Sequence, residues 1–64
     1  MDARFKVERW SKDGQHIEKV VAECDDVTAA RGAYRAVVEA WPEARWTLRQ
    51  AIRVLAEHPD PRRT

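Results

Sequence analysis

Hydrophobic and polar residues alternate along two runs near the beginning of the chain, Ala3–Trp10 and His16–Cys24. Alternation with a period of two is typical of β-strands that bury one face. The dipeptide Asp13-Gly14 separates the two runs, and Asp-Gly between alternating segments favours a two-residue turn in which both residues have positive φ. The pattern therefore predicts a β-hairpin.

The turn also predicts the register of this hairpin, because residues equally far from the turn would lie opposite each other. Trp10 is then paired with Ile17. Val7 is paired with Val20, on a face that is apolar throughout. The members of this face are Ala3, Phe5, Val7, Val20, Ala22 and Cys24. The other face carries pairs of opposite charge, Arg4 with Glu23 and Glu8 with Lys19. Such pairs stabilise antiparallel strands by roughly 0.2–1 kcal/mol each.

Residues 27–41 repeat apolar side chains at helical spacing, with polar side chains on the opposite arc. Asp25 and Asp26 precede this segment and offer an N-cap side chain. Pro42 is expected to end the helix at Trp41, because the residue before a proline is disfavoured in the α region. We expect the apolar stripe to pack on the apolar face of the hairpin. The stripe consists of Val27, Ala30, Tyr34, Val37, Val38 and Trp41.

The segment 46–57 fits two patterns. As a helix it would be capped by Thr47, with Gln50 completing a capping box. As a strand it would add to the hairpin, and this is favoured because a two-stranded sheet is marginal alone. The predicted fold is therefore a small α+β domain of ββαβ type, with an antiparallel sheet in the order 2-1-3 and one amphipathic helix on one face. A bend or tight turn is expected near Gln50-Ala51. The alternative is a ββαα domain with residues 47–58 helical.

Several of these features resemble a set of very short bacterial proteins of unknown function. The shared features are a hairpin, a helix that ends in Trp41-Pro42, the run WTLRQ at 46–50 and the run RVL at 53–55. The resemblance covers most of the chain and implies a similar compact fold, without a known activity or functional residues. Such proteins have glycine after the Leu-Arg-Gln run, where this chain has Ala51.

The chain of 64 residues is long enough for one domain. We expect a compact domain over residues 1–58 and a disordered tail over 59–64, which contains two prolines and no apolar side chain. Domains of this size bury only about 60% of their unfolded surface and often need a disulfide, a metal or a partner. The single cysteine, Cys24, cannot form an internal disulfide, and no Cys/His cluster suits zinc. A homodimer is therefore expected.

No motif for catalysis, cofactor binding or metal binding is found, and Asp25-Asp26 are explained by helix capping. We therefore expect a non-enzyme without a cofactor. The lone cysteine and the lack of an apolar signal or membrane-spanning run favour the cytoplasm, with no membrane partner. Cys24 itself is expected to be a small, buried or half-buried apolar residue.

Trp10 and Ile17 form a candidate interaction patch on the outer face of the hairpin, with Val21 diagonally near. A cluster that contains tryptophan on a small protein often marks an interaction surface. The alternative is a cross-strand pair that only stabilises the hairpin. The first functional hypothesis is therefore a structural or protein-interaction module that binds itself or another protein through the face or edge of its sheet.

The second hypothesis is a nucleic-acid-binding module. The net charge is +1, with −2 over residues 1–26 and +3 over 27–64, and the basic residues of the later part are all arginine. Arg45, Arg49 and Arg53 would line one side of the last segment as a possible anion-binding site. The alternative is that these arginines are solvated and pair with nearby glutamates. The small charge excess favours this alternative.

Overall fold

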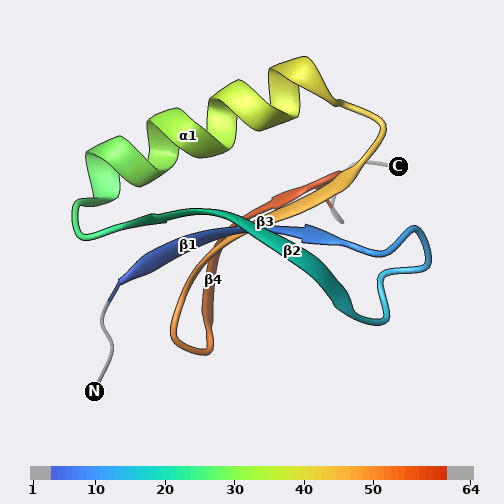
Figure 1. Ribbon diagram of the computed structural model, residues 1–64, viewed down its shortest axis with the longest axis horizontal. Coiled ribbons are helices and arrows are strands. Elements are labelled where there is room, and N and C mark those ends of the chain that lie inside the picture. Colours follow the sequence, from blue (N-terminus) through green and yellow to red (C-terminus); the bar gives the residue numbers. More distant parts are fainter. Residues whose placement is uncertain (1–3, 61–64) are drawn as a thin grey trace.

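The computed structural model describes residues 4–60, which form a four-stranded sheet with one helix on one of its faces (Figure 1). The elements in chain order are β1 (Phe5–Trp10), β2 (Ile17–Cys24), α1 (Val27–Ala40), β3 (Arg45–Gln50) and β4 (Arg53–His58). The strands lie in the order β2-β1-β3-β4, and all neighbours are antiparallel. The α+β class is confirmed. The predicted order 2-1-3 is incomplete, since β4 lies outside β3.

The segment predicted as one strand or one helix is a second hairpin. Its strands β3 and β4 are joined by a turn at Ala51-Ile52. Ala51 has φ 53°, the left-handed conformation that glycine adopts more readily. The predicted bend near Gln50-Ala51 is confirmed as this turn, whereas a helix over residues 47–58 is wrong. β3 pairs with β1 on one side and with β4 on the other, so its backbone is hydrogen-bonded on both sides, whereas β4 is an edge strand that pairs with β3 alone.

The first hairpin has the predicted register only near its turn. Trp10 lies opposite Ile17 as expected, but Val7 lies opposite Ala22 and not Val20. Register shifts in β2 cause this difference, because each bulge adds one residue that has no partner on β1. Val20 therefore lies opposite Glu8, on the face away from the helix, and not in the apolar face predicted for it.

The turn of the first hairpin is also longer than predicted. The N–H of Ser11 donates to the carbonyl of His16 over 2.8 Å, so residues 12–15 form a four-residue loop. Gly14 has φ 73°, whereas Asp13 is not among the residues with positive φ. Asp-Gly is therefore part of the turn, but only its glycine takes the left-handed conformation.

The side chain of Ser11 holds this loop together. It donates to Oδ1 of Asp13 over 2.5 Å and accepts from the N–H groups of Gln15 and His16. The hydrogen bond from Ser11, followed by the one from the N–H of Gln15, holds the pKa of Asp13 below its ordinary value. The hairpin is thus closed by a four-residue loop that the buried Ser11 hydroxyl stabilises, and not by a tight two-residue turn.

Helix α1 begins and ends where the sequence predicts. Asp26 caps it by accepting from the N–H of Ala29 over 2.9 Å, and Trp41 is the C-cap, before Pro42. Trp41 was expected in the packed stripe, but 58% of it is exposed, because it lies past the last helical residue. Its carbonyl accepts from Nε1 of Trp46 over 2.9 Å, and the two rings are 6.4 Å apart.

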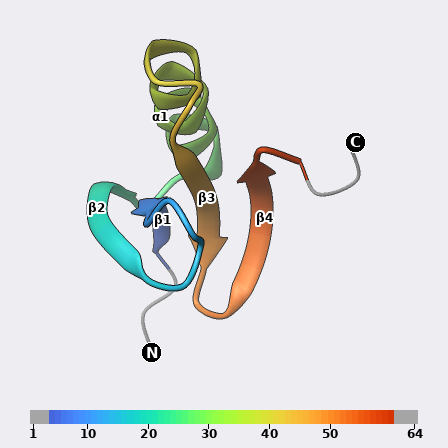
Figure 2. The ribbon, with the colours of Figure 1, turned by 90° about the vertical axis from the view of Figure 1, so that its right-hand side faces the viewer.

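The core lies between α1 and one face of the sheet. Its fully buried residues are Val7, Ala30, Trp46 and Leu48, and half-buried side chains from β1, β2, α1 and β4 pack around them. Cys24 is half-buried and packs against this core, as predicted. Figure 2 shows α1 on one side of the sheet, with β2 and β4 on either side of the central strands β1 and β3.

β4 ends at His58, whose Nε2 lies 2.7 Å from the carbonyl oxygen of Pro42, and the domain boundary at residue 58 stays a prediction. The disordered tail predicted for residues 59–64 lies outside the described residues from residue 61 onward, and its disorder stays a prediction. Ala3, the expected first residue of the first strand, also lies outside them.

Candidate functional site

The face of the sheet opposite α1, here called the open face, has no second layer within residues 4–60. Side chains alternate along a strand, and directly paired residues share a face. Since Val7 and Leu48 are buried under α1, their strand neighbours point to the open face. By the register, its members are Ile17, Val20 and Glu23 from β2; Lys6, Glu8 and Trp10 from β1; Arg45, Thr47 and Arg49 from β3; and Val54 and Glu57 from β4.

One corner of the open face is apolar. Trp10 is half-buried beside its partner Ile17, and Val20 follows on the same strand with 45% of its surface exposed. We call these three residues the apolar corner. The predicted patch of Trp10, Ile17 and Val21 differs in one member, because Val21 is an unpaired, exposed bulge residue. The sequence does contain an indication of this bulge, because the successive apolar residues Val20-Val21-Ala22 interrupt the alternation of the strand.

The centre of the open face is a buried carboxylate. Glu8 is only 1% exposed, and its Oε2 accepts from Nη2 of Arg49 over 2.8 Å. Its Oε1 accepts from the hydroxyl of Thr47 over 3.2 Å, and that hydroxyl accepts from Nε1 of Trp10 over 2.8 Å. The sequence reasoning paired Glu8 with Lys19, which instead lies opposite Arg9. A charge buried in this way is tolerated because it is paired and hydrogen-bonded.

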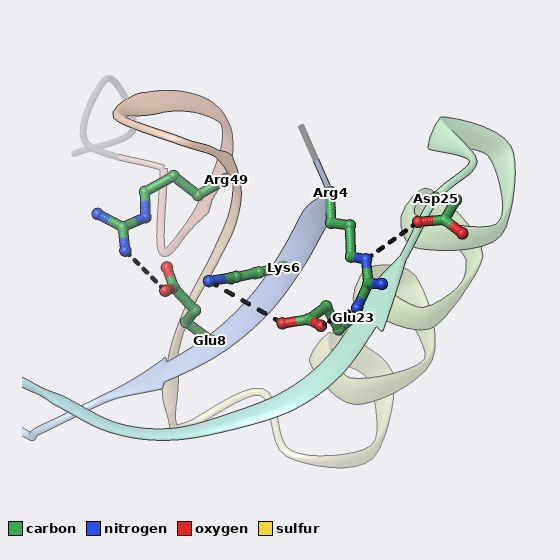
Figure 3. Close-up of polar contacts among 6 residues, drawn as sticks. All are labelled: Arg4, Lys6, Glu8, Glu23, Asp25 and Arg49. Atoms are coloured by element: carbon green, nitrogen blue, oxygen red, sulfur yellow. Dashed lines mark hydrogen bonds and ion pairs between the residues drawn. The ribbon is translucent and has the colours of Figure 1, made fainter. Parts of the chain in front are cut away.

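Figure 3 shows two separate groups of charges on this side of the sheet. The guanidinium of Arg49 on β3 is directed at the carboxylate of Glu8 on the neighbouring strand β1. At the edge formed by β2, Glu23 lies 2.8 Å from Arg4 and 3.9 Å from Lys6. The side chains of the edge group are more exposed than Glu8, so their contribution to stability is small.

The structure does not gather the three arginines proposed for anion binding. Arg45 and Arg49 lie on the open face, but Arg45 donates its Nε to a backbone carbonyl of the first hairpin loop and Arg49 is bound to Glu8. Arg53 is paired with Gln50, and Gln50 is paired with Phe5, which packs against the core. Because paired residues share a face, Arg53 lies on the helix side of the sheet. Nε of Arg49 is buried without an acceptor among the described residues.

A hollow of about 240 Å³ lies on the open face next to the apolar corner, and we call it the hairpin hollow. Trp10, Thr47 and Val54 contribute to its walls, and the charged side chains of Arg45 and Glu57 also line it. These residues come from three neighbouring strands, and the register brings them together. The hairpin hollow is thus partly apolar, with one charge of each sign beside it.

A wider hollow of about 520 Å³ lies on the helix side, between the end of α1 and the first hairpin. The exposed Trp41 and the charged Arg9, Lys12 and Glu18 are among its lining residues. Arg9 already interacts there, with Glu18 at 3.7 Å and with the ring of Trp46 at 5.8 Å. The wide hollow thus combines an aromatic surface with charged side chains.

Charged side chains line both hollows, and His58 also borders the hairpin hollow. Within residues 4–60, no three His, Cys, Asp or Glu side chains are grouped so that they could hold a metal ion. The helix in this part of the chain is too short and too polar to cross a membrane. Comparison of the chain with protein-family models, curated proteins and solved structures finds no match.

Proposed function

We propose that this protein is a small, non-catalytic interaction module that self-associates through its open face. The observation that carries the proposal is the apolar corner, where Ile17 and Val20 are exposed beside Trp10 on a face without a second layer. Apolar side chains clustered around a tryptophan on a small protein are typical of interaction surfaces. A domain of this size also gains stability from association, because its own core is small.

The charges of the open face suit a second copy of the same face. The register places three basic and three acidic side chains on it, so two such faces do not repel each other as a whole. The basic residues are Lys6, Arg45 and Arg49, and the acidic residues are Glu8, Glu23 and Glu57. A strongly charged partner of either sign would gain little from this balance.

The edges of the sheet are less suited to association than its face. Both outer strands, β2 and β4, carry register shifts. Bulges twist an edge and interrupt its row of free backbone groups, which is one way in which proteins prevent strand-to-strand pairing. The open face is therefore the better candidate for the surface through which the protein self-associates.

The size of the open face sets the expected affinity. Strands spaced about 4.8 Å apart, with about 3.3 Å per residue, give this four-stranded sheet with six-residue strands a face of roughly 19 by 20 Å. Two such faces bury roughly 800 Å² in total, below the range of about 1,200–2,000 Å² that is usual for stable specific interfaces. We therefore expect a weak dimer, with a Kd in the micromolar range or above.

Sedimentation equilibrium over a range from micromolar to millimolar protein tests this proposal. The wild type should dimerise, and Val20→Gln should weaken the dimer at least about tenfold, since one apolar anchor is lost. Val27→Gln is the matched control, because Val27 is similarly exposed, at 36%, but lies at the start of α1. A wild type that stays monomeric, or equal effects of both substitutions, would refute the proposal.

Nucleic-acid binding is the less well supported alternative. Two of the three candidate arginines are already hydrogen-bonded within the chain, and the third belongs to the other side of the sheet. A nucleic-acid interface would need several free cations on one surface, and its affinity would fall steeply with salt. Binding of a mixed-sequence oligonucleotide at low salt, lost on raising the salt, would favour this alternative over self-association.

A further inference from the structure

A groove of about 270 Å³ lies between α1 and the outer strand β4, and we call it the helix groove. It is present because α1 packs mainly on β1, β2 and β3 and covers β4 less. The half-buried side chains of Tyr34, Val38 and Ala56 line it. Ala56 is paired with the core residue Leu48, so the helix groove lies on the helix side of the sheet, away from the open face.

Two exposed arginines of α1, Arg31 and Arg35, also line the helix groove. Neither forms an ion pair or a side-chain hydrogen bond within residues 4–60. The arginines that do have partners are Arg4, Arg9, Arg45 and Arg49. Like charges four positions apart are slightly unfavourable for a helix. The pair therefore does not serve the helix itself, and both guanidinium groups are available to an anionic partner.

The spacing of the two arginines matches that of an extended peptide. At about 1.5 Å per residue, Arg31 and Arg35 lie about 6 Å apart along the axis of α1. In an extended chain, side chains two residues apart point the same way and are separated by about 6.6 Å. Guanidinium groups bind carboxylates through paired, charge-assisted hydrogen bonds. Two acidic residues separated by one position would therefore reach both arginines at once.

The chain contains its own example of an arginine that binds acidic residues at this spacing. Arg4 lies 2.8 Å from Glu23 and 3.3 Å from Asp25. These are the only two acidic residues of the sequence that are separated by one position. Because both carboxylates are already bound to Arg4, a second copy of the chain does not offer them to the helix groove. The occupant that the spacing favours is therefore a different protein.

We propose that the helix groove binds an extended acidic segment of another protein, in which two carboxylates separated by one residue are followed by an apolar side chain. The carboxylates bind Arg31 and Arg35, and the apolar side chain packs on Val38 and Ala56, about one helical turn further along α1. Glu39 lines the same end of the groove and disfavours a third carboxylate there. The segment is bound on the opposite side of the sheet from the open face, so this interaction goes beyond self-association.

Acidic residues near the helix groove make nucleic acid a less suitable occupant. Glu39 lines the groove itself. Burial, followed by the nearby charges of Glu57 and Asp60, raises the pKa of Tyr34, which shows that these acids also act on the groove. A nucleic acid would carry its phosphates past these carboxylates and be repelled by them. A short acidic segment that ends in an apolar side chain avoids this repulsion.

Fluorescence polarisation tests the proposal with a labelled synthetic peptide in which two glutamates, separated by one alanine, precede a leucine. We expect a Kd below about 1 mM. Arg31→Gln and Arg35→Gln should each raise it about three- to fivefold, the upper range of an exposed ion pair, and both together at least about tenfold. Arg53→Gln is the matched control, because it removes the same charge from an exposed arginine outside the groove. Absence of binding, or an equal loss in Arg53→Gln, would overturn the proposal.

Two altered peptides test the pattern of the partner. A peptide with adjacent glutamates should bind the wild type at least about threefold more weakly, because neighbouring side chains of an extended segment point to opposite sides. A peptide with serine in place of leucine should lose a similar amount, because no apolar side chain then enters the groove. Equal affinity of all three peptides would contradict the proposal. An oligothymidylate that displaces the peptide and binds more tightly would assign the groove to nucleic acid instead.

Backbone amide spectra locate the bound peptide. Its addition should shift the signals of Arg35, Val38 and Ala56, and leave those of Val20 and Val54 on the open face unchanged. Shifts confined to the open face would overturn the proposal. The dimer-weakening variant Val20→Gln should bind the peptide with the wild-type Kd within about twofold, so a failure of self-association and a failure of peptide binding are told apart.

Discussion

Arg49 and Glu8 form an ion pair on the face of the sheet that α1 does not cover, with Nη2 and Oε2 2.8 Å apart. The two residues are 41 positions apart in the chain and come from neighbouring strands. The Glu8 side chain is almost completely buried, whereas that of Arg49 is partly exposed. Arg49 is therefore the charged partner of a buried carboxylate, and its removal should leave that carboxylate without one.

Arg49→Met is expected to destabilise the fold by about 2–3 kcal/mol. The substitution leaves the Glu8 carboxylate buried with only the Thr47 hydroxyl as a partner. Breaking a fully buried ion pair costs about 3–5 kcal/mol, and the partial exposure of Arg49 lowers this figure. Urea unfolding followed by tryptophan fluorescence measures the loss.

Glu8→Leu combined with Arg49→Met is the control for that prediction. Apolar residues in place of a buried ion pair are often neutral or stabilising, because no charge is left without a partner. The double variant should therefore recover most of the stability that Arg49→Met alone loses. An additive loss in the double variant would show that the two residues act independently.

Gly32→Ala is expected to stabilise the protein by about 1 kcal/mol. Gly32 lies inside α1, where glycine costs about 1 kcal/mol relative to alanine. A Cβ added there would meet no atom within 4 Å, so the substitution brings no clash. The Tm should rise by roughly 4–8 °C in thermal unfolding. Ala36→Gly, also exposed on α1, is the matched control and should lower the Tm by a similar amount.

The alternation of residues was enough to predict most of the first hairpin and of its outer face. It placed Trp10 opposite Ile17 and away from the helix, as the structure shows. It could not predict that Val20 joins them, because a strand pattern assumes one residue per partner and β2 contains bulges. The bulges shift pairing by whole residues, so a side chain can change face without any change in local propensity.

The parts of the candidate site that the sequence did not predict depend on contacts between distant strands. Glu8 finds Arg49 only because β1 pairs with β3, and the chain order alone does not give that register. The second hairpin was ambiguous for a local reason. Its turn uses Ala51, at φ 53°, where glycine would have indicated a turn.

Ala51→Gly is expected to stabilise the protein by about 0.5 kcal/mol. A left-handed conformation costs a non-glycine residue roughly 1–2 kcal/mol, and the greater freedom of glycine in the unfolded chain offsets part of that gain. Gly14→Ala is the converse test, with φ 73°. A Cβ there would lie 3.5 Å from Arg45, an ordinary contact, so the expected loss of about 1 kcal/mol comes from the backbone. Opposite shifts in the urea midpoint confirm both predictions, and shifts of the same sign contradict them.

The hydrogen bonds to Asp13 predict a pH-dependent contribution to stability from the first hairpin loop. Ser11 and the N–H of Gln15 lower the pKa of Asp13 in the folded protein. The unfolded state has the ordinary value of about 3.9, so it binds the proton more readily. The stabilising effect is therefore present above about pH 4 and is lost as the pH falls through the lower, folded pKa.

Asp13→Asn removes this titration while it keeps an oxygen that can accept from the N–H of Gln15. The difference in unfolding free energy between wild type and Asp13→Asn should therefore be largest near pH 7 and shrink towards pH 2, measured by urea unfolding across that range. In a Ser11→Ala background the same difference should depend less on pH, because the largest cause of the lowered pKa is gone. If the difference in unfolding free energy between the wild type and Asp13→Asn stays constant from pH 7 to pH 2, Ser11 does not favour the charged form of Asp13.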